Sequence, residues 1–141
     1  MDAKECLKLA YKIEKVVEYR NLIEEQHIIS SRGVRVEELE VYKAETQRLI
    51  NRLTKLRLDI EKIVNEVKSP NERQVLELRY LLYRPWNNKF DKDTGELIAE
   101  GIIETMHYSS EAVYKYHAEG LKKIKVPKSF TVKYSELINY L

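Results

Sequence analysis

Residues 102–124, IIETMHYSSEAVYKYHAEGLKKI, contain two helical patterns separated by a short turn. A short helix is predicted over residues 102–106 and a longer one over residues 110–124. Ser109 is placed to cap the longer helix, and Glu111 in its first turn complements the positive end of the helix dipole. The stretch therefore predicts a helix-turn-helix unit.

The longer helix is predicted to have an apolar inward side and a polar outward side. Two helices joined by a tight turn hold a fixed angle only when apolar residues of both pack together, and the outward side of the second must stay free to enter the DNA major groove. The inward residues are expected to be Ile102, Met106, Val113, Gly120, Leu121 and Ile124. The outward residues are expected to be Ser110, Glu111, Tyr114, Lys115, Ala118 and Lys122.

Several side chains of this region are candidates for contacts with double-stranded DNA. Base edges or flanking phosphates are expected to be contacted by Ser110, Glu111, Tyr114 and Lys115, and phosphates by Lys122 and Lys123. The net charge of the chain is only +2, but residues 112–133 hold six lysines against a single acidic residue, Glu119. A solvated lysine-rich tail is the alternative explanation of that charge.

The pattern around this unit resembles that of a known protein family. The resemblance is carried by Arg79, Tyr80, Leu81, Trp86, Ile102, Met106, Tyr108, Ser109, Val113, His117 and the run Gly120-Leu121-Lys122-Lys123-Ile124. In these residues the chain is similar to small phage proteins related to the fourth region of bacterial sigma factors, such as the ArpU and RinA types of late-gene activators. The resemblance covers roughly residues 35–125 and implies a helical or coiled-coil front half, a DNA-binding helix-turn-helix and a role in transcription.

Two features depart from the family. Ala112 stands where the corresponding sigma-factor position is an arginine, so the resemblance does not define which bases are read. In the family, Trp86 would share a helix with the following isoleucine, but here fifteen residues separate it from Ile102.

An insertion at about residues 87–101 has an Asp-Lys-Asp-Thr-Gly centre, which predicts a β-hairpin. It is interpreted as a tolerated surface loop, which we favour, or as a wing against the DNA backbone.

A separate helix is predicted ahead of the insertion. Pro70 suits the first helical position after an N-cap at Ser69, and Glu72 stands at the capping-box position. The helix must end before Arg84-Pro85, because proline disfavours a helical residue ahead of it. The residues expected to face the core are Val75, Leu78 and Leu82.

Residues 1–68 predict a long antiparallel helical hairpin. Apolar residues recur at helical spacing in its first half, a loop containing Gly33 follows, and a stronger apolar stripe fills its second half. The stripe consists of Leu39, Tyr42, Thr46, Leu49, Leu53, Leu56, Ile60, Ile63 and Val67. Ile50 and Val64 widen it enough to face both the first helix and a second protomer, so a dimer is expected.

The sequence thus predicts an all-α fold in three parts: a coiled-coil-like hairpin (residues 1–68), a helix-turn-helix domain (69–126) and a C-terminal tail (127–141). In the tail, one or two helical turns are expected around residues 134–140, with no predicted place in the fold. The hairpin region holds fourteen basic and thirteen acidic residues, so its charge is nearly balanced. Excess positive charge is therefore expected near the C-terminal end.

Catalytic, metal and membrane functions are not expected. Cys6 is the single cysteine, the three histidines are scattered, and the spacing Asp91-x-Asp93-x-Gly95 lacks the ligands of a calcium loop. Motifs of nucleophilic or acid–base catalysis are missing, so no enzyme activity and no cofactor are predicted. The tyrosines are expected to fill helix faces rather than to stack on single-stranded nucleic acid. Without a run of about 18 apolar residues or a signal peptide, a cytoplasmic location and no membrane partner are expected.

Three functions fit these features. The favoured one is a dimeric phage or prophage transcriptional regulator that binds DNA, with host RNA polymerase as a further candidate partner. The first alternative is a small terminase-like subunit that recognises DNA for packaging, since such subunits also join a helix-turn-helix to an oligomerisation element. The second is a helical protein that contacts RNA polymerase but no DNA. A dimer favours regulation, whereas a ring of about eight or more protomers favours packaging.

Overall fold

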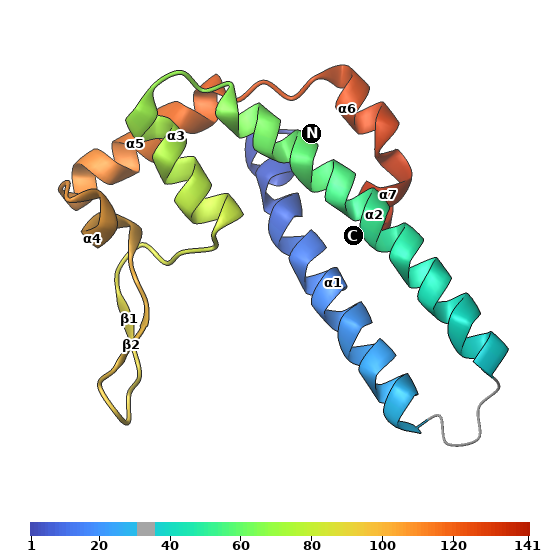
Figure 1. The fold of residues 1–141 in the computed structure, drawn as a ribbon. Helices are drawn as coiled ribbons and strands as arrows, with labels where there is room; N and C mark the ends of the chain where they lie inside the picture. Colours follow the sequence, from blue (N-terminus) through green and yellow to red (C-terminus); the bar gives the residue numbers. More distant parts are fainter. Residues whose placement is uncertain (31–35) are drawn as a thin grey trace.

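The computed structural model describes residues 1–30 and 36–141, and for residues 27–30 and 36 the backbone alone. These residues are mostly helical, with one small antiparallel sheet, which confirms the predicted all-α class (Figure 1). The predicted loop around Gly33 lies outside the described residues.

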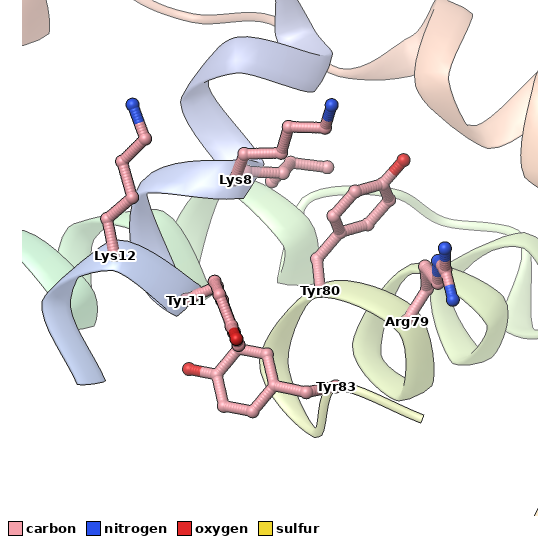
Figure 2. A pocket seen from close by; sticks show the side chains of 7 residues that line it. Lys8, Tyr11, Lys12, Arg79, Tyr80 and Tyr83 are labelled. Atoms are coloured by element: carbon pink, nitrogen blue, oxygen red, sulfur yellow. The ribbon is translucent and has the colours of Figure 1, made fainter. Parts of the chain in front are cut away.

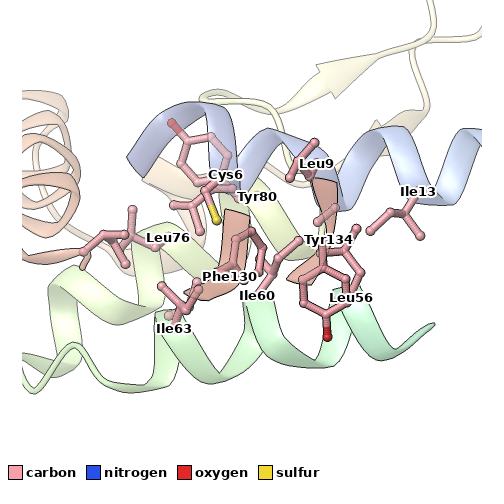
Figure 3. Packing of buried hydrophobic residues seen from close by; sticks show 14 of the residues in the cluster. Cys6, Leu9, Ile13, Leu56, Ile60, Ile63, Leu76, Tyr80, Phe130 and Tyr134 are labelled. Carbon is pink, nitrogen blue, oxygen red and sulfur yellow. The ribbon is translucent and has the colours of Figure 1, made fainter. Parts of the chain in front are cut away.

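Helices α1 (Ala3–Ser30) and α2 (Val36–Asn65) run antiparallel and form the predicted hairpin (Figure 1). The predicted apolar stripe is the side that α2 buries, and burial is deepest in its second half. The fully or nearly fully buried residues there, or just after the helix, are Leu53, Leu56, Ile60, Ile63, Val64 and Val67. The expectation that Val64 faces a second protomer is wrong, because the core of the chain itself buries it completely. On α1 their partners in the same core are Cys6, Leu7, Leu9, Ala10 and Ile13 (Figure 3). The main core therefore lies where the start of α1 meets the end of α2.

Helix α3 (Pro70–Leu76) continues into a π-helical turn, η1 (Glu77–Leu81). Pro70 occupies the predicted first position after an extended Ser69. The predicted capping box is wrong, because the Ser69 side chain makes no capping hydrogen bond and Glu72 bonds elsewhere. Glu72 is only 8% exposed, and its Oε2 lies 2.7 Å from Nζ of Lys123. A buried carboxylate without a charged partner costs more free energy than a helix start without a cap, so Glu72 pairs with Lys123.

Segment α3–η1 is buried on two sides. Val75 and Leu78 pack into a small core next to α4 (Ile102–Met106) and α5 (Ser110–Lys123), as predicted. Leu76 and Tyr80 pack into the hairpin core instead (Figure 3). The expectation that Leu82 would be buried is wrong, since it is 58% exposed. Its N–H bonds to the Glu77 carbonyl five residues back, and this wider turn shifts the helix faces and ends the helix there.

Tyr83 fixes the end of η1 to the hairpin. Its backbone has a φ of 58°, a conformation that is uncommon for a non-glycine residue. Its hydroxyl donates to the carbonyl of Ala10 (3.0 Å) and bonds the guanidinium of Arg57. Arg57 also donates to the carbonyl of Leu81 (2.9 Å). These bonds hold the point at which the chain leaves the helix for the insertion.

The insertion is a β-hairpin, as predicted. Strand β1 (Lys89–Phe90) pairs antiparallel with β2 (Leu97–Ala99), and the hairpin projects away from the helices (Figure 1). Asp91 stabilises the turn by accepting hydrogen bonds from the N–H groups of Asp93 (2.8 Å) and Thr94 (3.0 Å). Gly95 has the positive φ, 72°, that this turn requires.

The C-terminal tail folds back along α2 as helices α6 (Lys128–Lys133) and α7 (Ser135–Tyr140) (Figure 1). Phe130, Tyr134 and Leu137 are buried in the hairpin core. The Tyr134 hydroxyl donates to the carboxylate of Asp59, and Lys133 lies 3.3 Å from the same group. The tail that the sequence left unplaced is therefore part of the main core.

The close approach of α3 and α5 predicts the effect of a substitution at Gly120. A Cβ at this position would lie 3.1 Å from Cδ1 of Leu76 and 3.3 Å from the carbonyl oxygen of Glu72. Gly120→Val should therefore separate the helices and lower the free energy of unfolding by about 1–3 kcal/mol, measured by urea denaturation. Ala118→Val on the exposed side of α5 is the matched control and should cost less than about 1 kcal/mol. Equal losses in the two variants would contradict this packing.

Candidate nucleic-acid interface

The turn between α4 and α5 is fixed at both ends. His107 closes α4 in a left-handed conformation (φ 57°), and its N–H donates to the carbonyl of Ile103 (3.2 Å). The Ser109 hydroxyl accepts a hydrogen bond from the N–H of Ala112 (3.2 Å), which confirms the predicted cap of α5. Helix α4 begins at Ile102, because the preceding residues 97–99 form β2. The two helices and their turn thus have the predicted layout.

The inward side of α4 and α5 contains the predicted residues but serves two cores. Ile102, Met106 and Val113 join Val75 and Leu78 in the small core. The later part of α5 packs differently: Gly120 lies against α3, while Ile124 and the half-buried Leu121 contact the hairpin core. Because α5 is held at both ends by different neighbours, its orientation relative to the hairpin is fixed.

The outward side of α5 is exposed, as predicted, at Ser110, Glu111, Tyr114, Lys115, Ala118 and Lys122. Lys122 forms an exposed ion pair with Glu119 on the same helix (3.3 Å). Within the described residues, Lys115 makes no ion pair, so its charge is available to a ligand.

The remaining predicted phosphate contact, Lys123, is held on another side of the helix. Its ammonium group pairs with the buried Glu72 of α3. This pair joins α3 to the end of α5, and removal of Lys123 would leave a buried charge without its partner. The structure therefore brings Lys115 and Lys122 to the exposed side but directs Lys123 towards α3.

The lysines that follow α5 do not all lie in one place on the surface. Lys125 lines a pocket at the end of α5 together with Lys68 and Lys123, whereas Lys128 is exposed as the first residue of α6. Lys133 lies on α6, which packs along α2, and pairs with Asp59 there (Figure 1). The positive charge that the sequence concentrates in residues 112–133 is thus spread over separate parts of the surface.

An aromatic cluster connects α5 to the start of the insertion. The Trp86 ring meets Tyr114 edge-on at 5.1 Å and His117 edge-on at 4.9 Å. The guanidinium of Arg79 lies 4.8 Å from the centre of the Trp86 ring. On the other side, Nε2 of His117 lies 2.8 Å from the hydroxyl of Tyr80. Trp86 therefore packs against the small core and is also a neighbour of the candidate DNA contact Tyr114.

A basic and aromatic pocket of about 340 Å³ lies between α1 and η1 (Figure 2). It is lined by Leu7, Lys8, Tyr11, Lys12, Arg79, Tyr80 and Tyr83, and we call it the α1–η1 pocket. Figure 2 shows the Lys8 and Lys12 side chains extending from α1 on the same side of the view as the Tyr80 hydroxyl.

The sequence does not predict this pocket from overall charge, because the hairpin region as a whole is nearly balanced. A local signal is present: Lys4, Lys8 and Lys12 recur every four residues and therefore share one side of α1. The other half of the pocket comes from η1, some seventy residues later in the chain. Its position against α1 depends on tertiary packing, which lysine spacing does not reveal.

The described residues offer few groups for covalent or metal chemistry. Burial raises the pKa of the Cys6 thiol to about 11, so this side chain is a poor nucleophile. Among the residues that the structure describes, no three His, Cys, Asp or Glu side chains are placed to hold a metal ion. In the same part of the chain, no helix has the length and apolar character needed to cross a membrane.

Comparison with known proteins adds no relationship, because the chain matches no protein-family model, no curated protein and no solved structure.

The surroundings of His117 predict how stability depends on pH. Burial, followed by the positive charges of Lys4 and Arg79, lowers the pKa of His117 below its ordinary value of 6.5. The unfolded chain therefore binds more protons just below this pH, so the contribution of His117 is fully present above pH 6.5 and is lost as the pH falls from there through the lower pKa of the folded chain. Urea denaturation over this range should show a smaller loss of stability for His117→Gln than for the wild type. The same loss in both proteins would exclude the effect.

Proposed function

We propose that this chain is a DNA-binding transcriptional regulator of a phage or prophage, with α5 as the helix that enters the major groove. The observation that carries the proposal is the division of α5 into two sides. The inward side is fixed by two cores, and the outward side is exposed along the whole helix. A recognition helix requires this division, because it must be held rigidly while its outer side chains reach base edges.

The side chains on the outward side suit distinct roles. Ser110, Glu111, Tyr114 and Lys115 lie in the first half of α5, the half from which a recognition helix contacts bases. Lys122, in the last turn, is proposed to contact phosphate. Lys123 has a mainly structural role in this proposal, through its ion pair with Glu72.

Resemblance to sigma-factor region four favours transcription over DNA packaging. The residues that carry the resemblance have consistent roles in the fold: Ile102, Met106 and Val113 form the small core, and Ser109 caps α5. Contact with host RNA polymerase is a further part of the proposal. The β-hairpin is treated as a surface insertion, since its strands extend away from the helices (Figure 1).

Lys115 provides the test of DNA binding. Fragments of the phage and host genomes that the purified protein retains would be sequenced, and one retained duplex would be labelled for fluorescence anisotropy. The affinity of the wild type should fall steeply with salt, by roughly one log-log unit for each phosphate contact. Lys115→Glu should weaken binding at least about tenfold, because it places a negative charge next to the phosphates.

The matched control is Lys43→Glu, which makes the same charge change on the exposed surface of α2. It should bind the labelled duplex nearly as well as the wild type. If no duplex is bound even at low salt, the chain does not bind DNA, and the polymerase-contacting alternative gains support. A flat salt response would contradict the electrostatic part of the proposal.

A dimer is the proposed assembly. Tyr19 and Leu22 of α1 and Val41 of α2 are exposed on the hairpin, and burial of these side chains against a second copy would be favourable. Sedimentation equilibrium should therefore give twice the monomer mass, and Tyr19→Glu should shift the equilibrium towards monomers. A ring of about eight or more protomers would instead support a packaging role.

A further inference from the structure

Three lysines of α1 lie on one side of the helix with their charges uncompensated. Within the part of the chain that the structure describes, Lys4, Lys8 and Lys12 make no ion pair, whereas Lys15 pairs with Glu18 at 3.2 Å. All three are exposed. A stripe of like charges repels itself, so it is stabilised by a ligand of opposite charge.

The α1–η1 pocket concentrates this charge. Lys8 and Lys12 line it from α1 and Arg79 from η1, and none of the residues that line it is acidic. The Arg79 guanidinium has no carboxylate partner among the described residues: it donates to the carbonyl of Arg84 (3.1 Å) and stacks on Trp86. After the larger effect of burial, the nearby carboxylate of Glu14 also raises the pKa of the Tyr83 hydroxyl, but Glu14 does not line the pocket.

The tyrosines make the pocket a suitable site for an anion. Tyr11 and Tyr83 meet edge to face at 5.4 Å and form an aromatic wall. Tyr80 forms another part of the lining, with its hydroxyl bonded to His117. Such walls exclude part of the water, and the attraction between a cation and an anion is stronger where water is partly excluded.

Side-chain contacts link the pocket to α5. Arg79 lines the pocket and stacks on Trp86, which in turn meets Tyr114 of α5. Tyr80 lines the pocket and bonds His117 of α5. A duplex that places its major groove against α5 would therefore have its backbone within reach of η1 and the start of α1.

We propose that the α1–η1 pocket binds the phosphodiester backbone of the same DNA duplex, with Lys8, Lys12 and Arg79 as the phosphate-binding residues. This inference rests on the proposed DNA-binding function and adds the N-terminal helix to the interface. Phosphate contacts beside the recognition helix set the position and angle of a protein on DNA without reading its sequence. The pocket would give α5 a fixed register on the duplex.

The test is the double variant Lys8→Gln/Lys12→Gln. Both residues are exposed, so folding should be unchanged by circular dichroism and urea denaturation. Binding of a fluorescein-labelled random-sequence duplex would be measured by anisotropy across a salt series. The log-log salt slope should decrease by about 1.8, and affinity at about 0.1 M salt should fall at least tenfold. Hydroxyl-radical footprints on a retained genomic duplex should lose protection on one flank and keep it at the centre.

The matched control is Lys43→Gln/Lys55→Gln, which removes the same charge from exposed positions of α2 outside the pocket. If the wild type binds no duplex, the proposed function itself fails. If the wild type binds and Lys115→Glu weakens binding, but Lys8→Gln/Lys12→Gln behaves as this control, only the present inference is overturned. A second measurement adds inorganic phosphate and records NMR chemical-shift changes. If Lys8→Gln/Lys12→Gln loses the changes seen in the wild type but keeps full DNA affinity, the pocket binds a free anion and the inference is also overturned.

Discussion

The two-sided burial of the segment from Pro70 to Leu81 is the constraint on which the rest of the structure depends. Leu76 and Tyr80 belong to the hairpin core, while Val75 and Leu78 belong to the small core beneath α4 and α5. Neighbouring residues on a helix point in different directions, so a short segment contributes to both cores at once. The hairpin and the helix-turn-helix unit are therefore packed against a common element rather than joined by a free linker.

The orientation of α5 follows from this segment. Gly120 allows α5 to lie close to α3, and the Glu72–Lys123 pair joins their ends. With one side of the helix occupied in this way, only the side bearing Tyr114 and Lys115 remains open. The wide π turn at the end of the segment places Tyr83 against α1, and this position also forms the pocket that we propose as a phosphate site. The same packing thus shapes both parts of the proposed DNA interface.

The parts of this structure with local causes were predictable from the sequence. The α2 stripe, the Ser109 cap and the Asp91 turn each depend on residues a few positions apart, and the structure contains all three. The errors arose where a distant partner changes the result. Glu72 fits a capping box in sequence but is buried against α5. Leu82 fits the inward side of a regular α-helix, but a π turn moves it to the exposed side. The residue after it, Tyr83, then forms hydrogen bonds with α1 and α2. The sequence does not place the tail, because its helices are too short to be defined without α2.

The sequence by itself determined the helical class, the hairpin, the two sides of α5 and the residues on its outward side, because helical periodicity and capping are properties of neighbouring residues. Only the tertiary structure decided which charges remain free. Lys123 and Lys133 are paired by carboxylates of α3 and α2, while Lys8 and Lys12 line the α1–η1 pocket without an ion pair within the described residues. The charge available to a ligand depends on which side chains meet across the fold, and residues far apart in the chain meet only when the cores bring their helices together.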